Sequence, residues 1–223
     1  MTTAELAQFI DHTLLKPEAN AAAIEKLCLE AKQFHFYSVC INPCWIETCR
    51  NHLNQSDVKV CTVIGFPLGA QNTIAKVFET KAAIATGADE IDMVVNIGFI
   101  KSNMWQQVAI DIAAVVAAAG DLPVKVILET GLLTREEKIQ ACQAATSAGA
   151  TFVKTSTGFN PNNTTVEDVK LMKESISPHM QVKASGGVRD LKTMQAMIDA
   201  GATRIGTSSA AQFLSGNAAQ GTY

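Results

Sequence analysis

The chain has 223 residues, of which 48% are apolar and 17% are charged, and its net charge is −3 at pH 7. This composition is typical of a folded protein with a large core, and it excludes an intrinsically disordered chain and argues against a nucleic-acid partner, which needs a basic surface. No apolar stretch reaches the roughly 20 residues of a membrane helix, and residues 1–15 lack the apolar centre of a signal peptide, so we expect a cytoplasmic protein without membrane contacts.

Short runs rich in β-branched residues alternate with Ala-rich amphipathic segments along the whole chain. A short helix is expected first, over Ala4–Phe9. Strands are then expected at Ile10–Leu14, Tyr37–Asn42, Val58–Phe66, Glu90–Ile97, Val124–Glu129, Phe152–Thr155, Gln181–Ser185 and Arg204–Thr207. Helices are expected between and after them at Ala21–Phe34, Pro43–Leu53, Thr73–Thr86, Met104–Ala119, Thr134–Ala148, Thr164–Ile176, Asp190–Ala200 and Ser208–Leu214.

Strands that alternate with helices form parallel sheets through right-handed crossovers, and eight such units favour closure into a barrel. A repeated turn supports this reading. Gly87, Gly149 and Gly201 each follow a helical pattern and precede an apolar run, as a left-handed helix cap before the next strand would. The sequence therefore predicts an α/β protein, a (β/α)8 barrel of the TIM type with an extra N-terminal helix. Residues 1–223 would form one domain, with 214–223 as a mobile tail.

Four charged residues interrupt strands that should be apolar: Asp92, Lys125, Lys154 and Lys183. An ionised group inside a packed barrel carries a desolvation cost of about several kcal/mol unless it has a partner. Lys125 could have a structural role in place of a catalytic one, because Glu129 lies on the same strand face and the two could belong to an ion-pair network that fills the barrel. Lys154 and Lys183 are expected at the carboxyl ends of their strands, where barrel enzymes carry their catalytic groups.

The loops after the last three predicted strands are small, polar and rich in glycine. They comprise Lys154–Gly158, Ala184–Arg189 and Ile205–Ser209. Backbone N–H groups in such loops, next to helix N-termini, bind anions, and barrel enzymes commonly hold a substrate phosphate after strands seven and eight. Two lysines beside a phosphate site suggest a nucleophilic amine. Such an amine must lose its proton near pH 7, which burial and a neighbouring cation favour, and Asp92 could then move protons.

The chain contains six cysteines. Without a secretion signal they are expected to be free thiols in a reducing compartment. Cys40, Cys44, Cys49 and His52 could be considered as zinc ligands, but their spacing is not that of common zinc sites and a helix would scatter them. We expect no metal and no cofactor.

The chain resembles the deoxyribose-phosphate aldolases along essentially its whole length. The segments that carry the resemblance are Ile10–Lys16, Val39–Asn42, Gly65–Gly69, Glu90–Gly98, Lys125–Thr130, Phe152–Phe159, Val182–Arg189 and Ile205–Ser209. The resemblance implies a class I aldolase that reversibly cleaves 2-deoxy-D-ribose 5-phosphate to D-glyceraldehyde 3-phosphate and acetaldehyde.

The resemblance also implies roles for individual residues. Lys154 would form the Schiff base, Lys183 would lower its pKa, and Asp92 would be the general acid and base. Phosphate would bind at Gly158, Gly186, Gly187, Arg189, Gly206, Ser208 and Ser209. Asp11, Thr13 and Lys125 would line the site, with Cys40 nearby. The terminal Tyr223 is expected to deliver a phenol to the acetaldehyde proton, although a frayed end without a role is the alternative.

Other functions stay open at this stage. A Schiff-base aldolase or transaldolase-like barrel for another sugar phosphate would use the same lysines. A sugar-phosphate isomerase or epimerase would need an acid or base but no nucleophilic amine, and a sugar-phosphate-binding regulator would need neither. The expected partners are a sugar phosphate and small aldehydes, and a homodimer is possible because dimers are usual among relatives.

Overall fold

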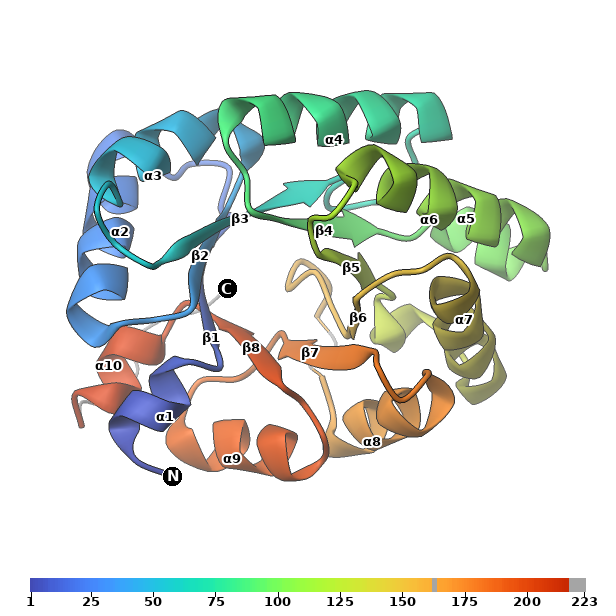
Figure 1. Ribbon diagram of the computed structural model, residues 1–223. Helices are drawn as coiled ribbons and strands as arrows, with labels where there is room; N and C mark the ends of the chain where they lie inside the picture. The colour runs from blue at the N-terminus through green and yellow to red at the C-terminus, as the bar shows by residue number, and fades with distance from the viewer. Residues whose placement is uncertain (162–163, 217–223) are drawn as a thin grey trace.

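Eight parallel strands close into one barrel in chain order (Figure 1). The computed structural model describes residues 1–161 and 164–216. The strands are β1 Ile10–Leu14, β2 Ser38–Ile41, β3 Lys59–Ile64, β4 Glu90–Val94, β5 Val124–Ile127, β6 Phe152–Lys154, β7 Gln181–Ser185 and β8 Arg204–Thr207. The predicted (β/α)8 barrel and all eight predicted strands are confirmed, although several strands are shorter than expected.

Helices surround the barrel on its outside (Figure 1). The α-helices are α1 Thr3–Ala7, α2 Ala21–Phe34, α3 Ile46–His52, α4 Thr73–Thr86, α5 Ile97–Lys101, α6 Trp105–Ala119, α7 Arg135–Ser147, α8 Val166–Ser175, α9 Leu191–Asp199 and α10 Ala210–Leu214. Two 3₁₀ turns, η1 Pro43–Trp45 and η2 Thr130–Leu132, complete the series. Helix α1 confirms the extra N-terminal helix. Leu214, the first residue of the predicted tail, is the last residue of α10, and residues 217–223 of that tail lie outside the described part of the chain.

The repeated glycine turn has the predicted conformation. Gly87 caps α4 with φ 112°, and its N–H donates to the carbonyl oxygens of Ala83 and Ile84. Gly149 and Gly201 also have positive φ, at 80° and 109°. Each turn lets the chain leave a helix and enter the next strand at once.

In two segments part of the chain forms another type of element than expected. The strand predicted over Glu90–Ile97 ends at Val94, because Asn96 caps a short helix, α5, by accepting a hydrogen bond from the Phe99 N–H. The helix predicted over Pro43–Leu53 begins as the 3₁₀ turn η1 before α3. Apolar residues alone do not distinguish a strand that continues from a capped helix that starts.

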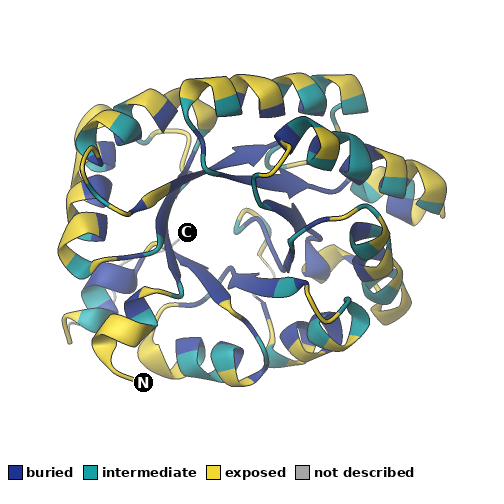
Figure 2. Ribbon diagram, in the orientation of Figure 1, coloured by how far each residue is buried: buried dark blue, intermediate teal, exposed yellow. Residues whose placement is uncertain are grey.

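The two faces of the barrel strands have different chemistry. The outward-facing Ile91, Val126, Val153 and Val182 are fully buried in the apolar core beneath the helices. The intervening residues point into the barrel, and many of them are charged. Figure 2 shows buried strands inside a ring of helices whose outer faces are exposed. Within residues 1–161 and 164–216, no helix combines the length and apolar character needed to cross a membrane.

Candidate active site

Side chains from alternate strands fill the barrel in levels, as in other barrels of this type. The first level, at the amino ends of the strands, contains Ser38, Glu90, Phe152 and Arg204. The middle level contains Asp11, Cys61, Lys125 and Lys183. The third level, toward the carboxyl ends, contains Cys40, Asp92, Lys154 and Gly206. Asp92, Lys154 and Lys183 therefore belong to two neighbouring levels.

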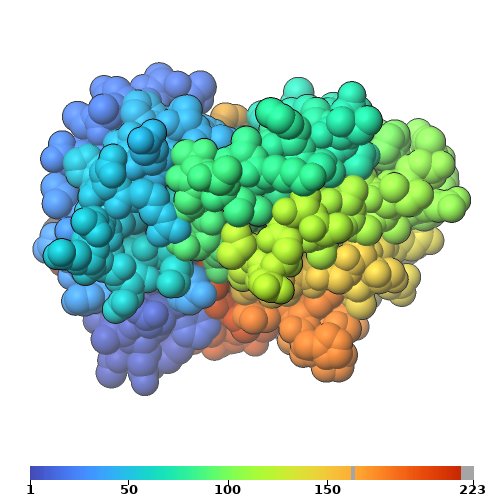
Figure 3. Space-filling model, turned by 45° about the horizontal axis from the view of Figure 1, so that its top comes forward, coloured from blue at the N-terminus to red at the C-terminus, as the bar shows by residue number. Residues whose placement is uncertain are grey.

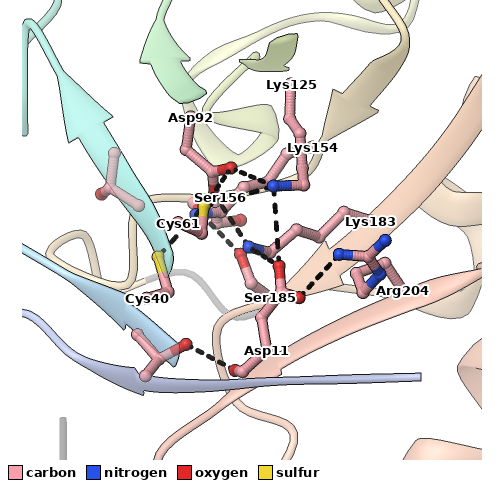
Figure 4. A network of polar contacts seen from close by, with 12 residues as sticks. Asp11, Cys40, Cys61, Asp92, Lys125, Lys154, Ser156, Lys183, Ser185 and Arg204 are labelled. Atoms are coloured by element: carbon pink, nitrogen blue, oxygen red, sulfur yellow. Dashed lines mark hydrogen bonds and ion pairs between the residues drawn. The ribbon is translucent and has the colours of Figure 1, made fainter. Parts of the chain in front are cut away.

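Asp92 contacts three lysines at the centre of this arrangement (Figure 4). Its Oδ2 lies 2.8 Å from the Nζ of Lys154 and 2.8 Å from the Nζ of Lys183. Its Oδ1 lies 2.8 Å from the Nζ of Lys125 and accepts a hydrogen bond from the Cys61 thiol at 3.1 Å. All three lysines are buried, and Lys154 is 2% exposed. The structure thus brings together the three residues that the sequence singled out for catalysis.

Strand register explains why the two predicted catalytic lysines meet. Lys154 and Lys183 are direct partners in the pairing of β6 with β7. Lys154 is the last residue of β6, as expected. Lys183 is instead the third residue of β7, because pairing with β8 extends that strand to Ser185. Its prediction at a strand end was therefore wrong, and it belongs to the level below that of Lys154, although both amines reach Asp92 Oδ2.

A second group of charges lies beneath the lysines. Arg204 Nη1 donates to Asp11 Oδ1 at 2.8 Å and to Glu90 Oε2 at 2.9 Å, and its guanidinium stacks 3.5 Å from the centre of the Tyr37 ring. Lys125 Nζ lies 2.7 Å from Glu90 Oε2. Asp11 also accepts a hydrogen bond from Lys183. The charged cluster thus runs from the barrel floor to Lys154.

The suggested pairing of Lys125 with Glu129 was wrong. Lys125 is held by Glu90 and Asp92 instead. Strand β5 ends at Ile127, and the left-handed backbone of Glu129, with φ 57°, turns its side chain toward the next loop. There Glu129 accepts a hydrogen bond from the Thr157 hydroxyl.

Burial and charge act in opposite directions on these groups. Burial would raise the pKa of Asp92, but Lys125, Lys154 and Lys183 together hold that pKa well below its usual range. Burial would lower the pKa of Lys183, but Asp11 and Asp92 raise it above its usual range. Lys125 has its pKa raised in the same way, chiefly by Asp92. Asp92 is therefore a carboxylate and Lys183 an ammonium near neutral pH.

Two cysteines face the cluster. Cys40 Sγ lies 4.0 Å from Asp92 Oδ2, as its predicted place beside the site implies, and Cys61 was not predicted. Among the described residues, the side chains close enough to share a metal ion are Cys40, Cys61 and Asp92, or Asp11, Cys61 and Glu90, and not the Cys44–His52 group. The carboxylates of both sets already bind lysine or arginine, whose positive charge disfavours a cation there.

A cavity of about 230 Å³ lies beside the carboxyl ends of β1, β6 and β8. Its lining includes three predicted site residues, Thr13, Gly158 and Ser208, and also Lys16 and Phe159, which were not predicted. The predicted Gly186 and Gly187 follow β7 with φ of 90° and 84°. Arg189 is exposed, and the Ser209 N–H donates to Thr207. Of these loops, those after β6 and β8 line the cavity, through Gly158 and Ser208.

Gly206 lies inside the barrel, where its lack of a side chain makes room for catalytic groups. A Cβ at this position would lie 2.9 Å from Ser185 Cβ and 3.2 Å from Lys183 Cε. Tyr223, the remaining predicted catalytic residue, lies outside the described residues.

Comparisons with known proteins agree with this arrangement. The model of the DeoC/LacD family aldolases matches residues 6–219. The chain belongs to the DeoC/LacD aldolase family. A deoxyribose-phosphate aldolase from Bdellovibrio bacteriovorus is 57% identical over 219 residues, which cover 98% of this chain and 100% of the relative. One from Clostridium perfringens is 56% identical over 224 residues, covering both chains fully.

Solved structures give the same result. A putative deoxyribose-phosphate aldolase from Coccidioides immitis superposes with a TM-score of 0.94 at 40% identity, over 97% of this chain and 87% of the other. A tetrameric deoxyribose phosphate aldolase from Aeropyrum pernix has a TM-score of 0.88 at 32% identity, over 96% of this chain and 91% of the other. The chain therefore combines a barrel typical of its family with a buried amine, Lys154, at the end of the strand whose following loop lines a cavity.

The sequence missed Glu90, Arg204 and Cys61, although a signal was present. Alternate residues of a strand share a face, so an inward-pointing Asp92 implies an inward-pointing Glu90. The same rule places Arg204 on the face of Gly206. Both charged residues stand first in their strands, where a charge is usually read as a solvated strand end.

Proposed function

We propose that this aldolase reversibly cleaves 2-deoxy-D-ribose 5-phosphate to D-glyceraldehyde 3-phosphate and acetaldehyde through a Schiff base on Lys154. The observation that carries the proposal is the position of Lys154. Its amine is almost fully buried and lies 2.8 Å from Asp92 Oδ2, with the Lys183 ammonium on the same oxygen. The names of the relatives supply the substrate.

The residues present can carry out each chemical step. The Lys154 amine attacks the aldehyde carbon of the open-chain sugar, and loss of water gives a protonated imine. A base then removes the proton of the C3 hydroxyl, the C2–C3 electron pair moves into the imine, and C3 leaves as the aldehyde of glyceraldehyde 3-phosphate. The remaining enamine gains a proton at C2, and hydrolysis of the new imine releases acetaldehyde.

Asp92 and Lys183 divide the proton transfers between them. Because three lysines hold the pKa of Asp92 down against the effect of burial, Asp92 is ionised near neutral pH and has a free proton-accepting form, which can take up a proton through a water. The Lys183 ammonium is the corresponding donor and also disfavours a second ammonium on Lys154. We propose Tyr223 as the donor to the enamine carbon, on the family resemblance alone.

The phosphate would bind at the mouth of the barrel. Gly158 and Ser208 line the cavity there, and Lys16 adds a positive charge. Gly186, Gly187, Arg189 and Ser209 stand in the adjoining loops after β7 and β8. Thr13 also lines the cavity, while from below Asp11 binds Lys183 and Lys125 binds Asp92. Backbone N–H groups and one or two cations are the donors that bind phosphate in such loops.

Reductive trapping tests the proposed nucleophile. Acetaldehyde and borohydride should leave an ethyl group on Lys154, because reduction fixes the imine in place. Peptide mass spectrometry locates the group, and Lys154→Arg should abolish both the adduct and cleavage. An ethyl group that maps mainly to a surface lysine, with cleavage intact in Lys154→Arg, would overturn the assignment. A chelator should leave activity unchanged.

We also propose a homodimer, in which an exposed apolar stripe on α4 forms the contact. Ile74 and Phe78 lie one turn apart on α4 and are 81% and 73% exposed. A cavity of about 380 Å³ between α3 and α4 lies beside Phe78. Figure 3 shows α4 on the outer surface next to α6. The reported tetramer of the Aeropyrum pernix relative supports self-association.

The six free cysteines support a reducing, cytoplasmic location.

A further inference from the structure

The charged cluster inside the barrel has unequal numbers of positive and negative groups. Its cationic side chains are Lys125, Lys154, Lys183 and Arg204. Its carboxylates are Asp11, Glu90 and Asp92. Glu129 is also buried, but it binds Thr157 and forms no ion pair with these cations among the described residues. The cluster therefore holds four cationic groups and three carboxylates, an excess of one.

A buried excess charge is unfavourable, and the simplest relief is the loss of one proton. The four cations are not equally able to lose it. Arg204 does not deprotonate in proteins. Lys125 lies within 4 Å of three carboxylates, and Lys183 binds two. Lys154 contacts one carboxylate oxygen, which it shares with Lys183, so it is the cation that its surroundings hold least.

We propose that Glu90, Lys125 and Arg204 are positioning residues that keep Lys154 a neutral amine by fixing a one-cation excess in the barrel. This inference rests on the proposed role of Lys154 as the Schiff-base lysine, and it extends that role to residues that do not touch the substrate. The raised pKa of Lys125 and of Arg204, each produced by the facing carboxylates against the effect of burial, agrees with it.

The groups around Lys154 come from every strand of the barrel. Asp92 and Lys183 are in direct or shared contact with it. The other titratable or charged groups that surround this pair are Asp11 of β1, Cys40 of β2, Cys61 of β3, Glu90 of β4, Lys125 of β5 and Arg204 of β8. The count takes both thiols as protonated: burial holds the pKa of Cys61 well above its usual range, whereas the hydrogen bond with Cys61 lowers the pKa of Cys40.

Opposite substitutions give opposite predictions. Lys125→Met removes a cation, so Lys154 should keep its proton to higher pH. The acid limb of kcat/KM and of borohydride trapping on Lys154 should then move up by about one pH unit or more. Glu90→Gln removes a carboxylate and should move the same limb down by a similar amount. The double variant Lys125→Met/Glu90→Gln restores the excess of one, and its acid limb should return close to that of the wild type.

If Glu90, Lys125 and Arg204 had only a structural role, each variant would lose activity but the pH of its acid limb would not change. Superimposable limbs in the two single variants, or shifts in the same direction, would overturn the inference. If borohydride trapping of the wild type leaves no adduct on Lys154, the proposed function is overturned instead. If Lys125→Met fails to fold, Arg204→Met should give the same upward shift, whereas Arg204→Lys keeps the charge and should keep the wild-type limb.

Discussion

Asp92 is the residue on which the cluster depends most, since three buried lysines donate to its two oxygens. Asp92→Asn keeps the shape of the side chain but removes its charge and its ability to take up a proton. We expect cleavage to fall by about 10²–10⁴-fold. We also expect a loss of roughly 3–5 kcal/mol of unfolding free energy, because buried ammonium groups lose their partner.

A second buried pair supplies the control for this prediction. Lys76 Nζ lies 2.6 Å from Asp111 Oδ2 between α4 and α6, and both residues are buried. Asp111→Asn should cost a comparable amount of stability and leave kcat near that of the wild type. If the two variants lost activity equally, Asp92 would have only a structural role.

The pKa of Asp92 also predicts how stability depends on pH. Its folded-state pKa is lowered, so its ionisation stabilises the fold at every pH above the unfolded value of about 3.9. The contribution is lost as pH falls from that value through the folded pKa. The stability difference between wild type and Asp92→Asn should therefore shrink as pH falls below about 4. Urea unfolding at a series of pH values measures it, and a difference that does not shrink below about pH 4 would contradict the prediction.

At the scale of elements, the loop after β7 depends on a left-handed backbone at Gly186. Its φ is 90°, and a Cβ there would lie 3.3 Å from Ser156 Cβ. Gly186→Ala should shift this loop and raise KM for the sugar phosphate about tenfold, with little change in trapping by acetaldehyde, which has no phosphate. Gly120→Ala is the control, because Gly120 has φ 61° with no atom within 4 Å of the added Cβ. An equal rise of KM in both variants would show that the loop after β7 does not bind the phosphate.

The strands of this barrel could be predicted because each is a short β-branched run between helical patterns. The third-level residues Asp92 and Lys154 could also be found, since a charge inside such a run is conspicuous. The partners of those charges could not be predicted in the same way. Glu90 and Arg204 are 114 positions apart in sequence and meet only because closure of the barrel brings β4 and β8 to the same interior level. Lys125 was assigned to the wrong carboxylate for a related reason, because local spacing favoured Glu129 over residues on other strands.

At the scale of the whole molecule, a closed barrel keeps the reacting amine within one chain. Lys154, Asp92 and Lys183 come from β6, β4 and β7 of the same barrel. The proposed dimer contact on α4 lies on the outer surface (Figure 3). Association should therefore affect stability more than the chemical step, because no predicted catalytic residue within the described part of the chain lies on the α4 stripe.

A charge placed on the α4 stripe tests this separation. Burial of a Phe78 side chain in a dimer would contribute about 1.5–3 kcal/mol, and Phe78→Glu replaces that gain with the cost of a buried carboxylate. We expect light scattering to give a dimer of the 23.8 kDa chain for the wild type and a monomer for Phe78→Glu, with trapping on Lys154 retained in both. Leu29→Glu, on α2 and 55% exposed, should stay dimeric. A wild type that is monomeric at micromolar concentration, or a Phe78→Glu variant that stays dimeric, would show that α4 is not the contact.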